Sequence, residues 1–116
     1  MFRFETLDIW RLANTLSSSI YRVTKSWPES ESFGLTSQIR RSALSIAANI
    51  AEGSAATTIK DYKHFLDHSR KSLFETVSHV LIARQEGYLS EDAKQKLYQE
   101  ADILSRKIVA FKNSLH

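Results

Sequence analysis

The segment LTSQIRRSALSIAANIAEGS, residues 35–54, decides the fold. Apolar residues recur in it every three or four positions, at Leu35, Ile39, Ala43, Ile46 and Ile50. This period predicts a helix over about residues 36–52. Further apolar residues widen the stripe, namely Leu44, Ala47, Ala48 and Ala51. A helix this apolar should be central, with neighbours on several sides.

The ends of this helix carry their own signals. Thr36 or Ser37 can cap its N-terminus with a side-chain oxygen. Gly53 is suited to end the helix in a left-handed conformation. Asn49 lies among apolar positions and therefore needs a hydrogen-bond partner if it is buried.

Three more helices follow from the same spacing, over about residues 4–25, 59–86 and 90–114. Thr58 with Asp61 predicts a capping box at the start of the 59–86 helix, and Ser90 predicts a cap for the last one. A heptad seam in the last helix consists of Leu97, Ala101, Leu104, Ile108, Phe111 and Leu115. Four helices with short connections predict an all-α protein, an antiparallel up-down-up-down four-helix bundle, with residues 1–116 as a single domain.

The sequence also predicts how the first helix, the loop before residue 35 and the 59–86 helix pack. In the first helix, Ile9 and Leu12 form a second apolar stripe, which either contacts a further partner or only broadens the core face. Phe33 should anchor the loop before residue 35 to the core. In the 59–86 helix, the expected inward residues are Tyr62, Phe65, Leu66, Ser69, Leu73, Thr76, Val77, Val80 and Leu81. Its outer face alternates in charge, with ion pairs expected along Lys63, Asp67, Lys71 and Glu75.

Composition limits the classes of protein that fit. The chain has no Cys, which excludes disulfides and thiolate metal sites and fits a cytoplasmic location. The first ten residues contain two carboxylates and do not resemble a signal peptide. No run approaches the roughly 18 apolar residues of a membrane helix. The net charge of +3 is a mild basic bias that permits binding to phosphates without proving it.

Catalytic and metal-binding patterns are missing, so we expect neither an enzyme nor a cofactor. The three glycines do not form a phosphate-binding loop, and no nucleophile elbow is present. His64 and His68 are four residues apart, a spacing that can bind a metal. Since no third ligand accompanies them, we predict surface histidines and no metal site.

The strongest polar feature is the pair Arg40 and Arg41, in a stretch without acidic residues. One interpretation is a phosphate or RNA contact. The other is a salt bridge between helices, to Glu52 or Glu75, or between subunits. A second basic group in the 59–86 helix comprises Lys60, Lys63, Arg70 and Lys71, for which an ion-paired, solvated face is the alternative. We do not expect base stacking, because no exposed aromatic ladder interleaves these cations.

Nearly the whole chain resembles a known family. The segments FETLDIW, GLTSQIRRSALSIAANIAEGS and KDYKHFLDHSRKSLFET are similar to the four-helix-bundle proteins encoded in intervening sequences of bacterial large-subunit (23S) ribosomal RNA genes. The pattern falls on Leu35, Gln38, Arg41, Ser45, Ile46, Asn49, Ile50, Ala51, Glu52 and Gly53, then on Ser72, Leu73 and Glu75. Before Ser72 the family pattern usually has a small residue and Gly, where this chain has Arg70 and Lys71.

The resemblance implies an antiparallel bundle that assembles as a ring, commonly a homopentamer. Related bundle proteins accompany the reverse transcriptases of diversity-generating retroelements and bind nucleic acid through a basic surface. We therefore expect a non-enzymatic, RNA- or DNA-associated protein, with a protein-interaction scaffold as the alternative. The candidate contacts are Arg40, Arg41, Lys63, Arg70 and Lys71, and structural roles are expected for Gln38, Asn49, Glu52, Gly53 and Glu75.

Overall fold

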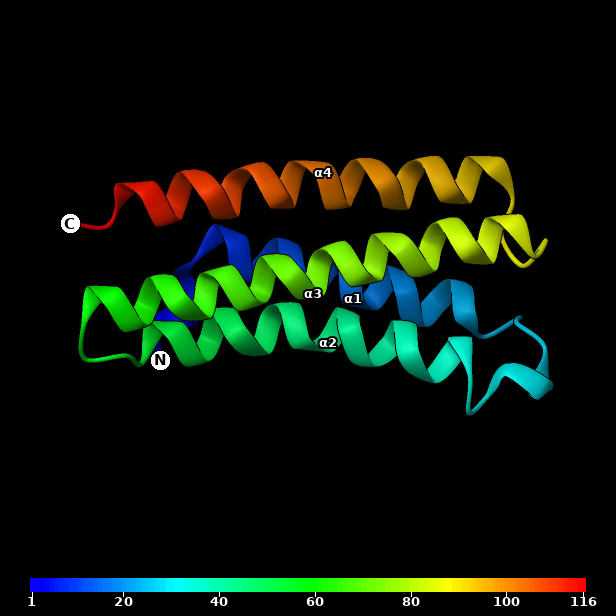
Figure 1. Ribbon diagram of the computed structural model, residues 1–116, viewed down its shortest axis with the longest axis horizontal. Helices are drawn as coiled ribbons and strands as arrows, with labels where there is room; N and C mark the ends of the chain where they lie inside the picture. Colours follow the sequence, from blue (N-terminus) through cyan, green and yellow to red (C-terminus); the bar gives the residue numbers. More distant parts are fainter.

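The computed structural model describes residues 1–116 and contains four long helices and two short 3₁₀ turns (Figure 1). The helices are α1 (Asp8–Thr24), α2 (Leu35–Ser54), α3 (Ile59–Gln85) and α4 (Glu91–Ser114), and the turns are η1 (Arg3–Thr6) and η2 (Glu29–Glu31). Successive helices run in opposite directions along a molecule of 44 × 24 × 23 Å (Figure 1). The predicted all-α four-helix bundle is confirmed.

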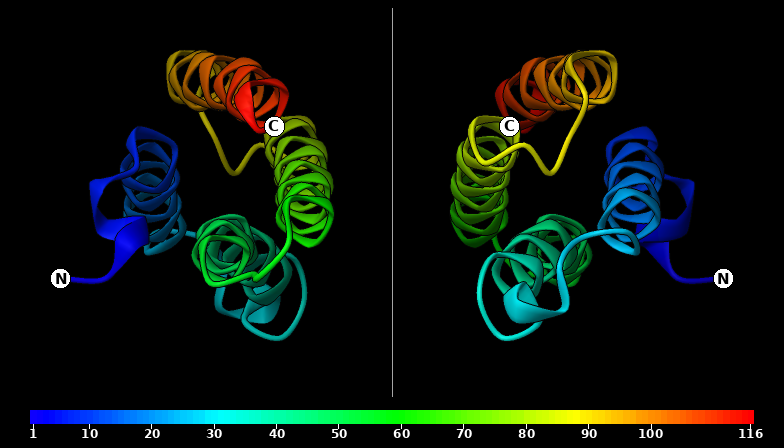
Figure 2. Two further views of the ribbon diagram at one scale, coloured as in Figure 1. Left: turned by 90° about the vertical axis from the view of Figure 1, so that its left-hand side faces the viewer. Right: turned by 90° about the vertical axis from the view of Figure 1, so that its right-hand side faces the viewer.

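Viewed end-on, the four helices surround one core, and each contacts its neighbours in the chain (Figure 2). α1 and α4 also contact each other, which closes the bundle. The most fully buried large side chains come from all four helices: Leu16, Ile20, Ile39, Ile46, Ile50, Leu66, Leu73, Leu104 and Ile108. None of the helices is both long and apolar enough to cross a bilayer.

The most extensive contact between two helices of the bundle is that of α2 with α3. Gly53 lies inside α2, and a Cβ there would stand only 3.0 Å from the Cβ of Phe65 and 3.1 Å from the Tyr62 ring. α2 continues past Gly53 to Ser54 with right-handed geometry. The prediction of a left-handed glycine cap was therefore wrong, because Gly53 serves close helix packing instead.

Hydroxyl groups set the register of α2 against α3. Thr76 donates a hydrogen bond to Ser42 (2.8 Å), and Ser69 donates to the carbonyl oxygen of Ile46 (2.8 Å). Both bonds are buried. Since a buried hydroxyl without a partner is costly, sliding one helix along the other would lose both bonds at once.

The N-terminus of α2 is capped from outside the helix. The N-cap residue is Gly34, which has no side chain, and neither Thr36 nor Ser37 caps the helix. Instead, the carboxylate of Glu31 in η2 accepts a hydrogen bond from the Leu35 amide (3.1 Å) and another from the Tyr88 hydroxyl (3.0 Å). A carboxylate at this end also complements the helix dipole. The predicted Thr36 or Ser37 cap was wrong for this reason.

Other caps agree with the sequence, because their signals are local. The Thr58 hydroxyl accepts from the Asp61 amide (3.1 Å), and the Ser90 hydroxyl accepts from the Ala93 amide (3.1 Å). The first helix begins at Asp8 rather than near residue 4, since residues 3–6 form η1. Local motifs thus predicted the starts of α3 and α4 but not that of α2.

Burial decides one alternative that the sequence left open and corrects two packing predictions. Ile9 is buried and Leu12 is half-buried, so the second stripe of α1 mainly broadens the core face. Phe33 is 99% exposed and does not anchor its loop; Trp27, which packs against Tyr88, does so instead. Leu81, expected inside, is exposed.

Candidate nucleic-acid interface

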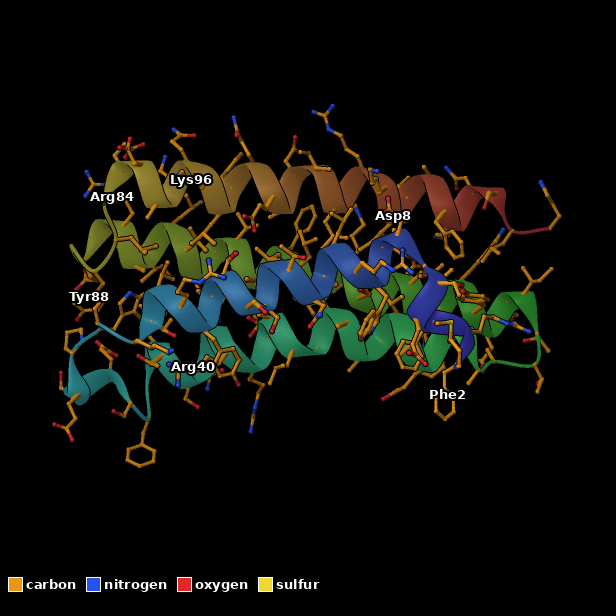
Figure 3. The ribbon with its side chains drawn as sticks, turned by 180° about the vertical axis from the view of Figure 1, so that it is seen from behind. Phe2, Asp8, Arg40, Arg84, Tyr88 and Lys96 are labelled. Atoms are coloured by element: carbon orange, nitrogen blue, oxygen red, sulfur yellow. The ribbon has the colours of Figure 1, made fainter.

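Arg40 is used inside the fold. Its Nε donates to the Thr24 hydroxyl of α1 (2.9 Å), and its guanidinium lies 4.7 Å from the centre of the Tyr21 ring. Figure 3 shows Arg40 where α2 passes α1. The expected salt bridge to Glu52 or Glu75 does not form; a hydroxyl and an aromatic face hold this arginine.

Arg41 is exposed on the outside of α2 and forms no ion pair within the chain. Glu75, its expected partner, lies 3.3 Å from His79 instead. Glu52 is exposed and also forms no ion pair. The two adjacent arginines therefore have different surroundings, and only Arg41 is free to contact another molecule.

The outer face of α3 carries several cationic and histidine side chains, with Asp61 and Asp67 among them. We call the α3 basic surface the set Lys60, Lys63, His64, His68, Arg70 and Lys71. The expected ion-pair ladder along this face does not form. Asp67 pairs with Lys112 of α4 (2.8 Å), because a carboxylate at that position reaches the neighbouring helix as easily as its own. Lys63, Arg70 and Lys71 are consequently left without a carboxylate partner.

Two shallow polar hollows lie along this surface. His68, Arg70 and Lys71 line one of them, and Lys60 and Lys63 line the other. Both share His64 and Asp67 in their walls, so they form one continuous strip. Arg40 and Arg41 line neither hollow. The structure thus brings together three of the five predicted contact residues and leaves the two arginines of α2 outside.

His64 and His68 contact each other within this strip. Their Nε2 atoms are 3.1 Å apart, so one ring donates a hydrogen bond to the other. No group of three or more histidine, aspartate or glutamate side chains is placed to hold a metal ion.

The residues expected to be structural fall into different environments. Asn49 donates hydrogen bonds to the carbonyl and hydroxyl oxygens of Ser45 (2.8 and 3.0 Å), and Ser45 is bonded to Ser72 of α3 (2.8 Å). This network supplies the partner that Asn49 needs. Gln38 is exposed on α2, and no side-chain contact explains its place in the pattern.

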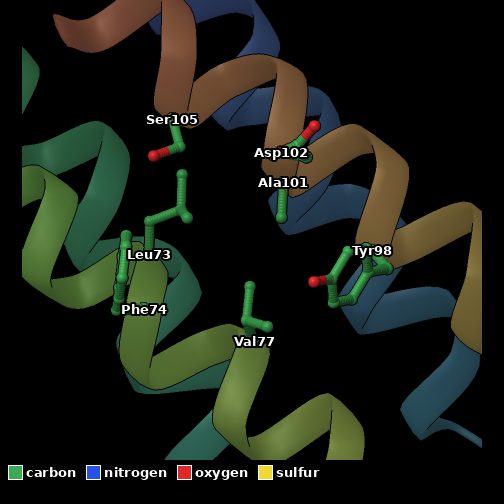
Figure 4. Close-up of a pocket in the computed structure, with 7 residues that line it drawn as sticks. All are labelled: Leu73, Phe74, Val77, Tyr98, Ala101, Asp102 and Ser105. Carbon is green, nitrogen blue, oxygen red and sulfur yellow. The ribbon is translucent and has the colours of Figure 1, made fainter.

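Two aromatic residues beside the basic surface were missed. Phe74 is 56% exposed, and the Arg70 guanidinium lies 4.8 Å from its ring centre. Tyr98 of α4 is 46% exposed and lines the same groove as Phe74 (Figure 4). Neither follows a sequence ladder, since the two residues meet only when α3 packs on α4. The sequence signal available was Phe74 four residues after Arg70, a helical spacing.

Shifted pKa values occur away from this surface. Hydrogen bonds from Lys94, Arg84 and Gln95 lower the pKa of Glu91 to about 2. A hydrogen bond to Glu31 raises the pKa of Tyr88. Although perturbed groups often mark functional sites, both of these tie loops to helix ends, so their causes are structural.

Comparisons with known proteins bear on the fold and the family. A search of curated proteins found no match to the chain. A crystal structure of a protein of unknown function from the S23 ribosomal protein family of Bacteroides thetaiotaomicron VPI-5482 is similar, with a TM-score of 0.81. The two chains are 19% identical, and the match covers 91% of this chain and 99% of that one. This likeness shows the shared fold.

The family comparison covers almost the whole bundle. The model of the 23S rRNA-intervening sequence protein family matches residues 5–110, from η1 into the last turns of α4. Neither this description nor that of the structural relative names an enzymatic activity. The chain therefore belongs to the family of 23S rRNA-intervening sequence proteins.

Proposed function

We propose that this protein is a non-catalytic accessory protein that associates with RNA through the α3 basic surface. One observation carries the proposal: Lys63, Arg70 and Lys71 line one continuous strip, with Lys63 half-buried and the other two exposed, and none of them forms an ion pair. Unpaired cations on one helix face provide the electrostatic footprint that binding to a phosphate backbone requires. Arg41 adds a free cation on α2, whereas Arg40 is committed to α1.

A salt titration of RNA affinity tests this proposal. The substitutions Lys63→Ala, Arg70→Ala and Lys71→Ala remove three charges together. We expect binding to single-stranded RNA to weaken, and the slope of log affinity against log salt to fall by about 0.7 for each lost phosphate contact. The matched control removes three exposed, unpaired cations elsewhere, Arg22, Lys25 and Lys96.

Lys96 of the control lies on α4 (Figure 3), in a hollow that it lines with Arg22 and with no residue of the α3 basic surface. Both triple variants change the net charge equally, so a general charge effect would weaken them equally. Equal losses, or wild-type affinity that salt does not change, would refute the proposal.

We also propose that the chain forms a homo-oligomeric ring, a homopentamer according to the family resemblance. Exposed apolar side chains support this: Leu44, Leu81, Ile82, Ile103 and Val109 are each at least 36% exposed. These side chains come from α2, α3 and α4, and contacts between copies of the chain would remove them from water. Light scattering should give several times the 13.3 kDa chain mass; a monomer at micromolar concentration would refute the ring.

The same apolar side chains support the alternative function, a scaffold for another protein. In that case a pull-down retains a specific protein while RNA binding is absent or insensitive to salt. RNA retention without a protein partner would count against the scaffold.

A further inference from the structure

The groove between α3 and α4 lies directly beside the α3 basic surface. It is lined by Leu73, Phe74 and Val77 of α3 and by Tyr98, Ala101, Asp102 and Ser105 of α4 (Figure 4). Its volume of about 170 Å³ is smaller than the pockets that hold drug-sized ligands. A groove of this size suits one small, flat group rather than a large ligand.

Phe74 joins the groove to the basic strip. It lines both the apolar groove and the hollow that contains Arg70 and Lys71. With Arg70 at 4.8 Å from its ring centre, a cation is held at the edge of the apolar site. The apolar groove and the hollow that contains Arg70 and Lys71 therefore meet at a single side chain.

Tyr98 supplies the opposite wall. Its ring lies across the groove from Phe74, and its hydroxyl points into the space between the two helices (Figure 4). Both rings are about half exposed, at 56% and 46%. Large exposed aromatics at a groove gain contact area on binding, and Tyr98 can also hydrogen-bond to a polar edge.

We propose that this groove binds the base of an unpaired nucleotide between Phe74 and Tyr98, with Arg70 and Lys71 holding the adjacent phosphate. Proteins recognise single-stranded RNA by stacking splayed-out bases on aromatic rings and arginine planes. The charge beside the groove favours this occupant over an apolar helix, because Arg70 and Lys71 form no ion pair and can attract phosphate. The nearby carboxylates are already paired, Asp102 with Arg106 (3.3 Å) and Asp67 with Lys112 (2.8 Å). The inference rests on the proposed RNA association and assigns it a base-binding site.

The test compares probes with and without bases. Full-length protein is titrated with a labelled oligouridylate, with a duplex RNA of the same length and with an abasic ribose-phosphate strand. We expect the single strand to bind more tightly than either other probe. Phe74→Leu and Tyr98→Leu keep apolar bulk, and each should weaken oligouridylate binding by at least about fivefold without changing abasic-strand binding.

Phe33→Leu is the matched control, since Phe33 is an exposed phenylalanine in a loop outside the groove. It should bind every probe like the wild type. Thermal unfolding of each variant, together with unchanged abasic-strand binding, shows that the fold is retained.

Three results would overturn the inference and can be told apart. If no probe binds, the proposed RNA association fails as well. If RNA binds but both groove variants and the abasic strand match the wild type, only the base site fails. If the groove variants change the mass measured by light scattering, the groove is an interface between copies of the chain.

Discussion

At the scale of single residues, Arg40 and Arg41 show how neighbours in the sequence diverge in the fold. Successive residues of a helix point about 100° apart, so Arg40 faces Thr24 and Tyr21 of α1 while Arg41 faces outward. The sequence left both interpretations of the pair open. The arrangement of α1 against α2, which no local pattern records, separates them.

This difference predicts that the two arginines contribute unequally to the free energy of unfolding. Arg40→Ala removes an inter-helix hydrogen bond and a cation–π contact, and should lower the free energy of unfolding by about 1–2 kcal/mol. Arg41→Ala should change it by less than about 0.5 kcal/mol. Urea denaturation measures both. The opposite order of losses would show that Arg40 is not a packing residue.

Glu31 is the second residue whose role depends on tertiary structure. Its carboxylate caps α2 and accepts the Tyr88 hydroxyl hydrogen bond. Gly34 is suited to this arrangement, since a Cβ there would stand 2.7 Å from the carboxylate oxygen. The sequence suggested caps within the helix because cap rules consider adjacent side chains, and Glu31 lies four residues upstream in another turn.

Loss of the cap should therefore be measurable. Glu31→Ala is expected to lower the free energy of unfolding by about 0.5–2 kcal/mol, the usual cost of losing an N-cap. Glu29→Ala, in the same turn, is the control and should be close to neutral. Equal effects of the two substitutions in urea denaturation would contradict the capping role.

The carboxylate of Glu91 should make a contribution to the free energy of unfolding that is lost in acid. Its pKa falls from the ordinary value of 4.5 to about 2 in the folded chain, so the folded state favours the ionised form. The resulting stabilisation is fully present above about pH 4.5 and disappears as the pH falls to about 2. Glu91→Gln should flatten the pH dependence of unfolding in this window. An unchanged profile for Glu91→Gln would contradict this assignment.

At the scale of elements, the α2–α3 contact determines how closely the bundle packs. Periodicity predicted both helices, and each end agrees within about two residues, because apolar spacing is a local property. The closeness of the pair and its hydroxyl bonds could not be predicted, since they depend on which faces meet. The same limit explains why the predicted ion-pair ladder along α3 was wrong. Asp67 pairs with Lys112 of α4 instead.

Gly53→Ala tests this contact. In an exposed helix the change would add about 1 kcal/mol of stability. Here the new methyl meets the Phe65 Cβ at 3.0 Å, and that atom cannot move without its helix. Overpacking of this kind costs about 1–3 kcal/mol, so we expect a net loss in denaturant unfolding. A gain in stability would show that α2 and α3 separate easily.

At the scale of the whole molecule, the sequence and the fold describe different parts of the candidate site. Lys63, Arg70 and Lys71 were predicted as contacts from their charge alone, and they do lie on one strip. The groove with Phe74 and Tyr98 could not be predicted, because its two walls come from different helices. The charge on one helix face can be predicted from the sequence. A surface made by two helices can be predicted only once it is known how they pack.

We propose that this bundle contacts RNA through α3. The most direct measurement is ultraviolet crosslinking of the protein in cells, followed by sequencing of the recovered RNA and mapping of the crosslinked peptides by mass spectrometry. We expect RNA above the level of a non-crosslinked control, with nucleotides attached to peptides from residues 60–74. Recovery of no RNA, or crosslinks confined to α1 and the outer face of α4, would contradict the claim.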